Sequence, residues 1–97
     1  MKVRWSDQAD GDRADIVGYI WLDNPVAAAR IDHLLDAAAD RLVDFPHSGR
    51  QGDIPGTREV IPHPSYRIVY EVADREVIIL AVVHTARQWP PAKDETS

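Results

Sequence analysis

The sequence predicts an α+β fold in which a helical hairpin packs on one face of an antiparallel sheet. Apolar residues recur every three or four positions from Pro25 to Phe45, which is the spacing of a helix. After residue 56 the period changes to two, which is the spacing of strands. A loop rich in helix breakers, residues 46–56, separates the two regions. We find no repeat or linker, and expect one domain over residues 1–91 with a flexible tail at 92–97.

The first half of the chain predicts a short strand and two helices. Residues 2–5 have the length and mixed character of a strand, and Ser6 can cap the helix that follows. The first helix has an apolar stripe of Ala9, Ile16, Tyr19 and Ile20. Asn24 and Pro25 start the second helix, expected to end at Asp44, because asparagine caps well and proline at the first helical position loses no needed hydrogen bond. Its stripe contains Ala27, Ile31, Leu34, Leu35, Ala38, Leu42 and Phe45. The short connection predicts an antiparallel hairpin.

The second half predicts three strands, at residues 57–61, 66–72 and 76–84, joined by turns at 62–65 and 73–75. The last strand is apolar on both faces, as a central strand is. A three-residue turn at 73–75 places the even-numbered residues of the last two strands on one apolar face, including Tyr66, Ile68, Tyr70, Val72, Ile78, Leu80 and Val82. The other face, with Arg67, Val69 and Glu71, is then open to a partner, and His84 lies opposite Arg67. A two-residue turn would instead put Arg67 and His84 on one face.

Composition excludes several classes of protein. With no cysteine there is neither a disulfide framework nor a thiolate metal site. The longest apolar run, residues 77–83, is far shorter than the roughly 20 residues of a membrane span, and we find no signal peptide. We therefore expect a cytoplasmic protein without a membrane partner. The net charge of −5 argues against a chain whose whole surface binds nucleic acid, and we expect no sequence-specific contact with it.

The four histidines do not have the spacing of a zinc site, and no nucleotide-binding glycine loop occurs, so we expect no metal and no cofactor. What remains is a set of basic residues in the C-terminal half: Arg50, Arg58, Arg67, His84 and Arg87. Histidine can move a proton near neutral pH and arginine can stabilise a pentavalent phosphate, so the set could cleave RNA without metal. Alternatively, Arg67 and Glu71 form cross-strand ion pairs and His84 simply ends a strand.

An ordered set of short motifs spans residues 3–90 and resembles one family. The motifs are Trp5 with Ala9, Tyr19-Ile20, Asn24-Pro25 with Ala28, Phe45-Pro46 with Gly49-Arg50, Gly56-Thr57-Arg58-Glu59, Tyr66-Arg67-Ile68-Val69-Tyr70, and Val83-His84 with Arg87 and Trp89-Pro90. In this order and spacing they resemble the RelE/ParE superfamily of toxin–antitoxin modules. The resemblance implies a helical hairpin packed on an antiparallel sheet, which agrees with the periodicity.

The resemblance implies one of two mechanisms. RelE-like members cut messenger RNA in the ribosome with basic residues and a histidine or a C-terminal tyrosine, whereas ParE-like members lack most of that set and poison DNA gyrase. Here residues 45–66, where many RNA-cutting members have lysines, contain no lysine and only the arginines Arg50 and Arg58, and no tyrosine follows Tyr70. We therefore expect a ParE-like, non-catalytic toxin. The alternative is a nuclease, with Arg58, Arg67, His84 and Arg87 as candidate catalytic residues, and the third possibility is a degenerate, non-toxic binding module.

Either kind of toxin implies a cognate antitoxin, a small DNA-binding protein that forms a hetero-oligomer with it. Similar toxins are held by an antitoxin segment that lays a helix on an apolar groove. The expected contact residues are Trp21, Leu22, Arg67, Val69 and Glu71. Trp21 and Leu22 could instead close the core at the hairpin turn.

Overall fold

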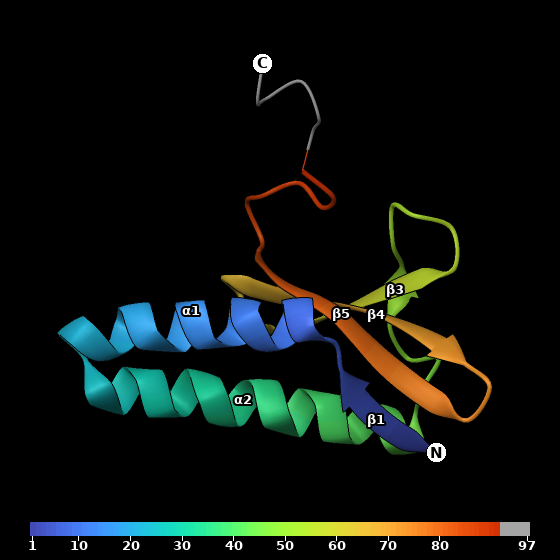
Figure 1. The fold of residues 1–97 in the computed structure, drawn as a ribbon, viewed down its shortest axis with the longest axis horizontal. Helices are drawn as coiled ribbons and strands as arrows, with labels where there is room; N and C mark the ends of the chain where they lie inside the picture. The colour runs from blue at the N-terminus through green and yellow to red at the C-terminus, as the bar shows by residue number, and fades with distance from the viewer. Residues whose placement is uncertain (92–97) are drawn as a thin grey trace.

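A computed structural model describes residues 1–91, and the predicted tail at 92–97 lies outside them. The elements follow the predicted order, with one short strand added. They are β1 (Lys2–Trp5), α1 (Asp7–Asp23), α2 (Pro25–Asp44), β2 (Arg50–Gln51), β3 (Thr57–His63), β4 (Tyr66–Ala73) and β5 (Glu76–His84). The two helices lie side by side as an antiparallel hairpin, and its tip extends beyond the sheet (Figure 1). The predicted α+β class is confirmed.

Both helices begin at the predicted caps. The Ser6 hydroxyl accepts a hydrogen bond from the Ala9 amide at 3.1 Å, and the Asn24 side chain accepts one from the Ala27 amide at 3.1 Å. Each bond satisfies an amide that has no partner within the first turn. Pro25 follows Asn24 at the first helical position, so α2 starts and ends where the sequence predicts.

The sheet has five strands in the order β1-β5-β4-β3-β2. It is mixed, because β1 runs parallel to β5 while the other pairs are antiparallel, so the expected all-antiparallel sheet is corrected. β2 lies within the predicted loop and pairs only Arg50 with Glu59 and Gln51 with Arg58. β3 continues to His63, two residues further than predicted, and leaves a shorter turn.

The predicted three-residue turn before β5 is wrong. Ala73 pairs with Glu76, so the turn has two residues, and Asp74 adopts a positive φ of 54°. The register then shifts between Val69 and Tyr70, because Leu80 is an extra residue in β5. Beyond this bulge Tyr66 pairs with His84 and Arg67 with Val83. His84 and Arg67 therefore lie on opposite faces as predicted, although the bulge and not the turn puts them there.

The start of α1 satisfies the polar groups that the bulge frees. The Leu80 carbonyl accepts a hydrogen bond from the Ser6 hydroxyl at 3.2 Å, and the Val82 amide donates to the Asp12 carboxylate at 3.1 Å. A buried backbone group without a partner costs free energy comparable to a lost hydrogen bond, so these contacts fix α1 on β5.

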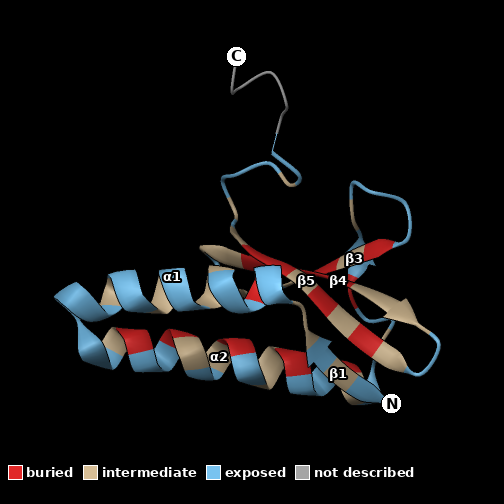
Figure 2. Ribbon diagram, viewed as in Figure 1, coloured by how far each residue is buried: buried red, intermediate tan, exposed pale blue. Residues whose placement is uncertain are grey.

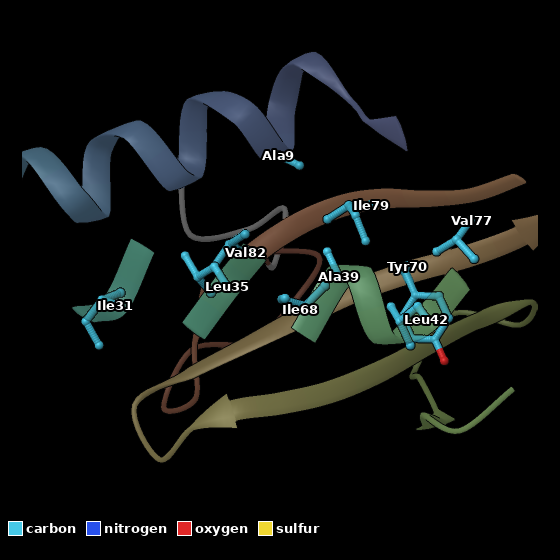
Figure 3. Packing of buried hydrophobic residues seen from close by; sticks show 10 residues of the cluster. All are labelled: Ala9, Ile31, Leu35, Ala39, Leu42, Ile68, Tyr70, Val77, Ile79 and Val82. Atoms are coloured by element: carbon cyan, nitrogen blue, oxygen red, sulfur yellow. The ribbon is translucent and has the colours of Figure 1, made fainter. Parts of the chain in front are cut away.

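The core lies between α2 and the inner face of the sheet, the face that the helices cover (Figure 3). Its most buried members are Ala9, Ile31, Leu35, Ala39, Leu42, Ile68, Tyr70, Val77, Ile79 and Val82. The inner residues of β4 are those predicted, but Val77 and Ile79 replace the expected Ile78 and Leu80 because the two-residue turn pairs Val72 with Val77 and Tyr70 with Ile79. The bulge at Leu80 then returns Val82 to the inner face. Tyr19 and Phe45, both assigned to apolar stripes, are 79% and 61% exposed. The two ends of the hairpin thus contribute less to the core than the spacing indicates.

Candidate functional site

A buried ion pair lies on the outer face of the sheet, the face turned away from the helices. Glu59 on β3 pairs in register with Val69, and Arg67 is two residues before Val69 on β4, so the side chains of Glu59 and Arg67 share this face. Arg67 Nη1 donates to Glu59 Oε2 at 2.8 Å, and the side chains are only 9% and 4% exposed. Such a pair is strong in this environment, because little water screens it.

Each member of the pair has a second partner. Glu59 Oε1 accepts from Arg50 Nη2 at 3.1 Å, and Arg67 Nη2 donates to the backbone carbonyl of Arg87 at 2.6 Å. Among the side-chain nitrogen and oxygen atoms of residues 1–91, only Arg67 Nε is buried without a hydrogen-bond partner. The guanidinium of Arg67 is therefore already engaged by the protein, and binding a phosphate would require it to leave Glu59.

His84 lies at the end of β5, away from this ion pair. Its Nδ1 accepts a hydrogen bond from the Ala86 amide at 3.1 Å, and its ring stands edge-on to Tyr66 with 5.7 Å between centroids. The side chain of His84 is exposed, and its Nδ1 is occupied by this hydrogen bond. His84 and Arg67 point to opposite sides of the sheet, so they cannot act together on one phosphate without a rearrangement.

The other two nuclease candidates do not complete a site. Arg58 Nη1 donates to the carbonyls of Gly49 at 2.8 Å and His47 at 3.2 Å, which fastens the loop after α2 to β3. Arg87 is exposed and touches Arg67 through its backbone carbonyl. Of the four candidates, Arg87 lies beside two others. Its carbonyl accepts from Arg67, and its amide donates to the His84 carbonyl at 2.9 Å, with His84 and Arg87 lining one hollow. Arg67 itself is bound by Glu59. The alternative that Arg67 forms a cross-strand ion pair is confirmed, and its partner is Glu59 on β3.

The hairpin tip is the most apolar exposed part of the described surface. Trp21 is 58% exposed and Leu22 is 85% exposed, so neither closes the core at the hairpin turn. Val26, at the start of α2, is 75% exposed, and the sequence analysis did not name it as a contact residue. Figure 2 shows the exposed residues at this end of α1, where no strand lies beneath the helices. The sequence indicates these exposed residues by their position at the end of α1 and the start of α2.

The outer face of the sheet is less open than expected. Val69 is completely buried and Arg67 is 7% exposed, so neither side chain offers surface to a partner in this conformation. Glu71 is half-buried. The expectation of an open face at Arg67 and Val69 is therefore corrected, and Arg67 is held there by Glu59 and the Arg87 carbonyl.

Arg13 joins the two helices. Its Nε and Nη1 contact Asp32 at 2.7 Å and Asp36 at 2.8 Å, and its guanidinium carbon lies 4.8 Å from the centre of the Trp5 ring. The hydrogen bond from Arg13 lowers the pKa of the Asp36 carboxyl, and the same bond raises the pKa of Arg13. Arg13 interrupts the apolar stripe of α1 because it forms ion pairs with Asp32 and Asp36 of α2.

Within residues 1–91, no three histidine or carboxylate side chains gather into a group that could hold a metal ion. Neither helix in that range combines the length and apolar content needed to cross a bilayer.

Comparison with known proteins identifies the family. A model of the ParE toxin of type II toxin–antitoxin systems matches residues 3–89. The chain belongs to this family. It is 41% identical over 90 residues to a Sinorhizobium fredii protein named as toxin Y4kP, an alignment that covers 92% of this chain and 93% of that protein. It is 38% identical over 86 residues to toxin RelE2 of Caulobacter vibrioides, covering 89% and 97% of the two chains.

Solved structures show the same fold. A chain of the chromosomal ParDE system from P. aeruginosa superposes with a TM-score of 0.77 at 20% identity, over 87% of this chain and 95% of that one. A YoeB/ParE toxin from Agrobacterium tumefaciens gives a TM-score of 0.64 at 17% identity, over 87% and 98%. The family model and the two relatives together make this chain a type II toxin of the ParE/RelE family.

Proposed function

We propose that this toxin is ParE-like: it inhibits DNA gyrase, does not cut RNA, and is neutralised in the cytoplasm by a cognate antitoxin. One observation carries the proposal. Arg67, the arginine best placed in the sequence for RNA cleavage, is buried and paired with Glu59 at 2.8 Å, while His84 lies on the opposite face. A general acid or base must reach the proton that it transfers, and these two residues do not share a substrate position.

The charge of the chain supports the same proposal. Binding to ribosomal RNA gains much of its affinity from arginine and lysine contacts to phosphates. Here the net charge is −5, and Arg13, Arg50 and Arg67 are each paired with a carboxylate. A protein target needs no such excess of free cations.

The exposed apolar residues at the hairpin tip support an antitoxin contact there. Trp21 and Leu22 are large, apolar and exposed, which is the character of residues that anchor a partner. Of the other expected contacts, Glu71 is within reach at the surface, whereas Arg67 and Val69 are covered and would need the outer face to open. We therefore place the antitoxin contact at the hairpin and not on the outer face.

The nuclease alternative has one argument in its favour, the relative named toxin RelE2 at 38% identity. In that case Arg67 would leave Glu59 and meet His84 after a rearrangement of β5. Complete loss of toxicity in a folded His84 variant would indicate this mechanism.

Growth assays in an inducible host test the proposal. Expression of the chain alone should arrest growth, and co-expression of the antitoxin encoded beside it should restore growth. His84→Ala should remain as toxic as the parent, and so should the matched control His33→Ala on the exposed face of α2, because neither ring contacts a reacting group in the ParE-like account. Unchanged growth at high expression would contradict the toxin function. A folded but harmless His84→Ala variant would replace the gyrase mechanism with the nuclease.

A further inference from the structure

A hollow of about 860 Å³ lies between α1 and the segment that follows β5. Figure 1 shows this segment leaving the end of β5 close to α1. Val82, near the end of β5, and Tyr66, at the start of β4, line the hollow between the two sides. Sites that hold a ligand or an inserted side chain have volumes of about 300–1,000 Å³. Trp21 and Leu22 are not among its lining residues, so the hollow is separate from the hairpin tip.

Hydrogen bonds to the sheet hold both sides of the hollow in place. On the α1 side, the Asp12 carboxylate accepts from the Val82 amide at 3.1 Å. On the other side, the Arg87 carbonyl accepts from the buried guanidinium of Arg67 at 2.6 Å. The hollow is therefore formed before a partner arrives, and binding there loses little conformational entropy.

One face of α1 presents a carboxylate and an aromatic ring to the hollow. Gln8, Asp12, Asp15 and Tyr19 are four, three and four residues apart, so they share this face of the helix. Both carboxylate oxygens of Asp12 are already engaged, by Gln8 and by the amide of Val82. Asp15 is exposed without an ion-pair partner among residues 1–91, and Tyr19 is 79% exposed. The described chain thus leaves the Asp15 carboxylate and the Tyr19 ring to a partner.

This combination of groups favours a cation. The face of an aromatic ring attracts a cation that lies within about 6 Å of its centre, and a carboxylate beside the ring adds a full negative charge. Trp89, half-buried on the other side of the hollow, supplies a second ring. Arg87 lies on the same side as Trp89, so the negative charge is concentrated on the α1 side. An arginine or lysine can direct its charge to Asp15 and pack its aliphatic stem on Ile16.

The net charge decides between the possible sources of this cation. A second copy of the chain is disfavoured, because each copy carries −5 and two copies repel each other. Enzymes that hold DNA present arginine and lysine side chains to its phosphates, so the surface of such a target is complementary to an acidic toxin. We infer that the hollow receives an arginine or lysine of DNA gyrase, held by the Asp15 carboxylate and by the rings of Tyr19 and Trp89. The inference rests on the proposed function, and it assigns the contact with the target to a surface separate from the antitoxin contact.

Asp15→Lys and Asp40→Lys form a matched pair of variants. Each replaces an exposed helical aspartate and changes the net charge by the same amount, but Asp40 lies on α2 and outside the hollow. The toxin concentration that halves supercoiling by gyrase should rise about tenfold or more for Asp15→Lys, because like charges then meet. It should stay within about twofold of the parent for Asp40→Lys.

Tyr19→Gln tests the aromatic half of the site without changing any charge. Glutamine is a good helix former and Tyr19 is exposed, so the melting temperature should stay within about 4 °C of the parent. Inhibition of gyrase should again weaken by about tenfold or more, as for a tyrosine at the centre of an interface.

The measurement is supercoiling by purified gyrase against a titration of each purified toxin, beside titration of the same toxins with the antitoxin. Weakened inhibition by Asp15→Lys and Tyr19→Gln, with antitoxin affinity matching that of Asp40→Lys and the parent respectively, supports the inference. Inhibition equal to that of the parent in both variants overturns it and leaves the proposed function standing. A loss of antitoxin affinity in place of gyrase inhibition also overturns it, as does a dimer of the free chain that Tyr19→Gln abolishes. A parent that does not inhibit gyrase at all contradicts the proposed function, and the inference with it.

Discussion

Replacing Glu59 with glutamine tests whether the ion pair on the outer face is structural. Glu59 is 4% exposed, so Glu59→Gln leaves Arg67 as a buried cation with only the Arg87 carbonyl and one neutral amide oxygen near it. Breaking a buried pair by removing one member costs about 3–5 kcal/mol. A domain of this size has a free energy of unfolding of roughly 5–15 kcal/mol, so the loss is a large share of the total.

The reverse change should cost less. Arg67→Met leaves Glu59 with its second partner, Arg50, whose side chain is 64% exposed and can move to cover the carboxylate. We expect the loss at the lower end of the same range, about 3 kcal/mol, and we expect the double variant to be more stable than the sum of the two losses predicts.

Urea unfolding of the four proteins, followed by circular dichroism, measures both the losses and the coupling between them. A loss below about 1 kcal/mol for Glu59→Gln, the level of an exposed ion pair, would refute the structural role that we assign to Arg67.

Two further predictions concern the loop after α2 and the contact between the helices. Gly49→Ala should destabilise the chain by about 1–3 kcal/mol in thermal melts, because the added Cβ would lie 2.6 Å from the Tyr70 hydroxyl and 2.8 Å from a backbone carbonyl. Asp36→Asn should lower stability at pH 7 by at most about 1 kcal/mol, since this carboxylate is 57% exposed. Because the pKa of Asp36 is lowered in the folded chain, its contribution is present above the unfolded pKa near 3.8 and is lost as the pH falls through the folded pKa. The two proteins should therefore converge in stability at acid pH, and a difference that grows there would contradict this assignment.

Local signals were sufficient to predict most of the fold. Asn24 and Pro25 fix the start of α2 whatever surrounds them, and the unbroken apolar run from Val77 to Val83 marks an interior strand. The resemblance to the family also rests on local signals, namely the order and spacing of short motifs along the chain.

The features that the sequence did not predict depend on distant contacts. The bulge at Leu80 is stabilised by two distant residues. Ser6 binds Leu80, 74 residues later, and Asp12 binds Val82, 70 residues later. No local sequence pattern therefore indicates the bulge. The identity of Glu59 as the cross-strand partner of Arg67 depends on how β3 lies beside β4. Tyr19 fits the apolar spacing of α1, but it is 79% exposed.

A gyrase assay with the purified toxin tests the central claim most directly. Supercoiling of plasmid DNA should be inhibited, or cleaved complexes of gyrase and DNA should accumulate, in proportion to the toxin added, while messenger RNA on translating ribosomes stays intact. The antitoxin should abolish the effect. Unaffected gyrase together with site-specific cleavage of messenger RNA, lost in a folded Arg67→Ala variant, would contradict the account and identify an RNA-cutting enzyme.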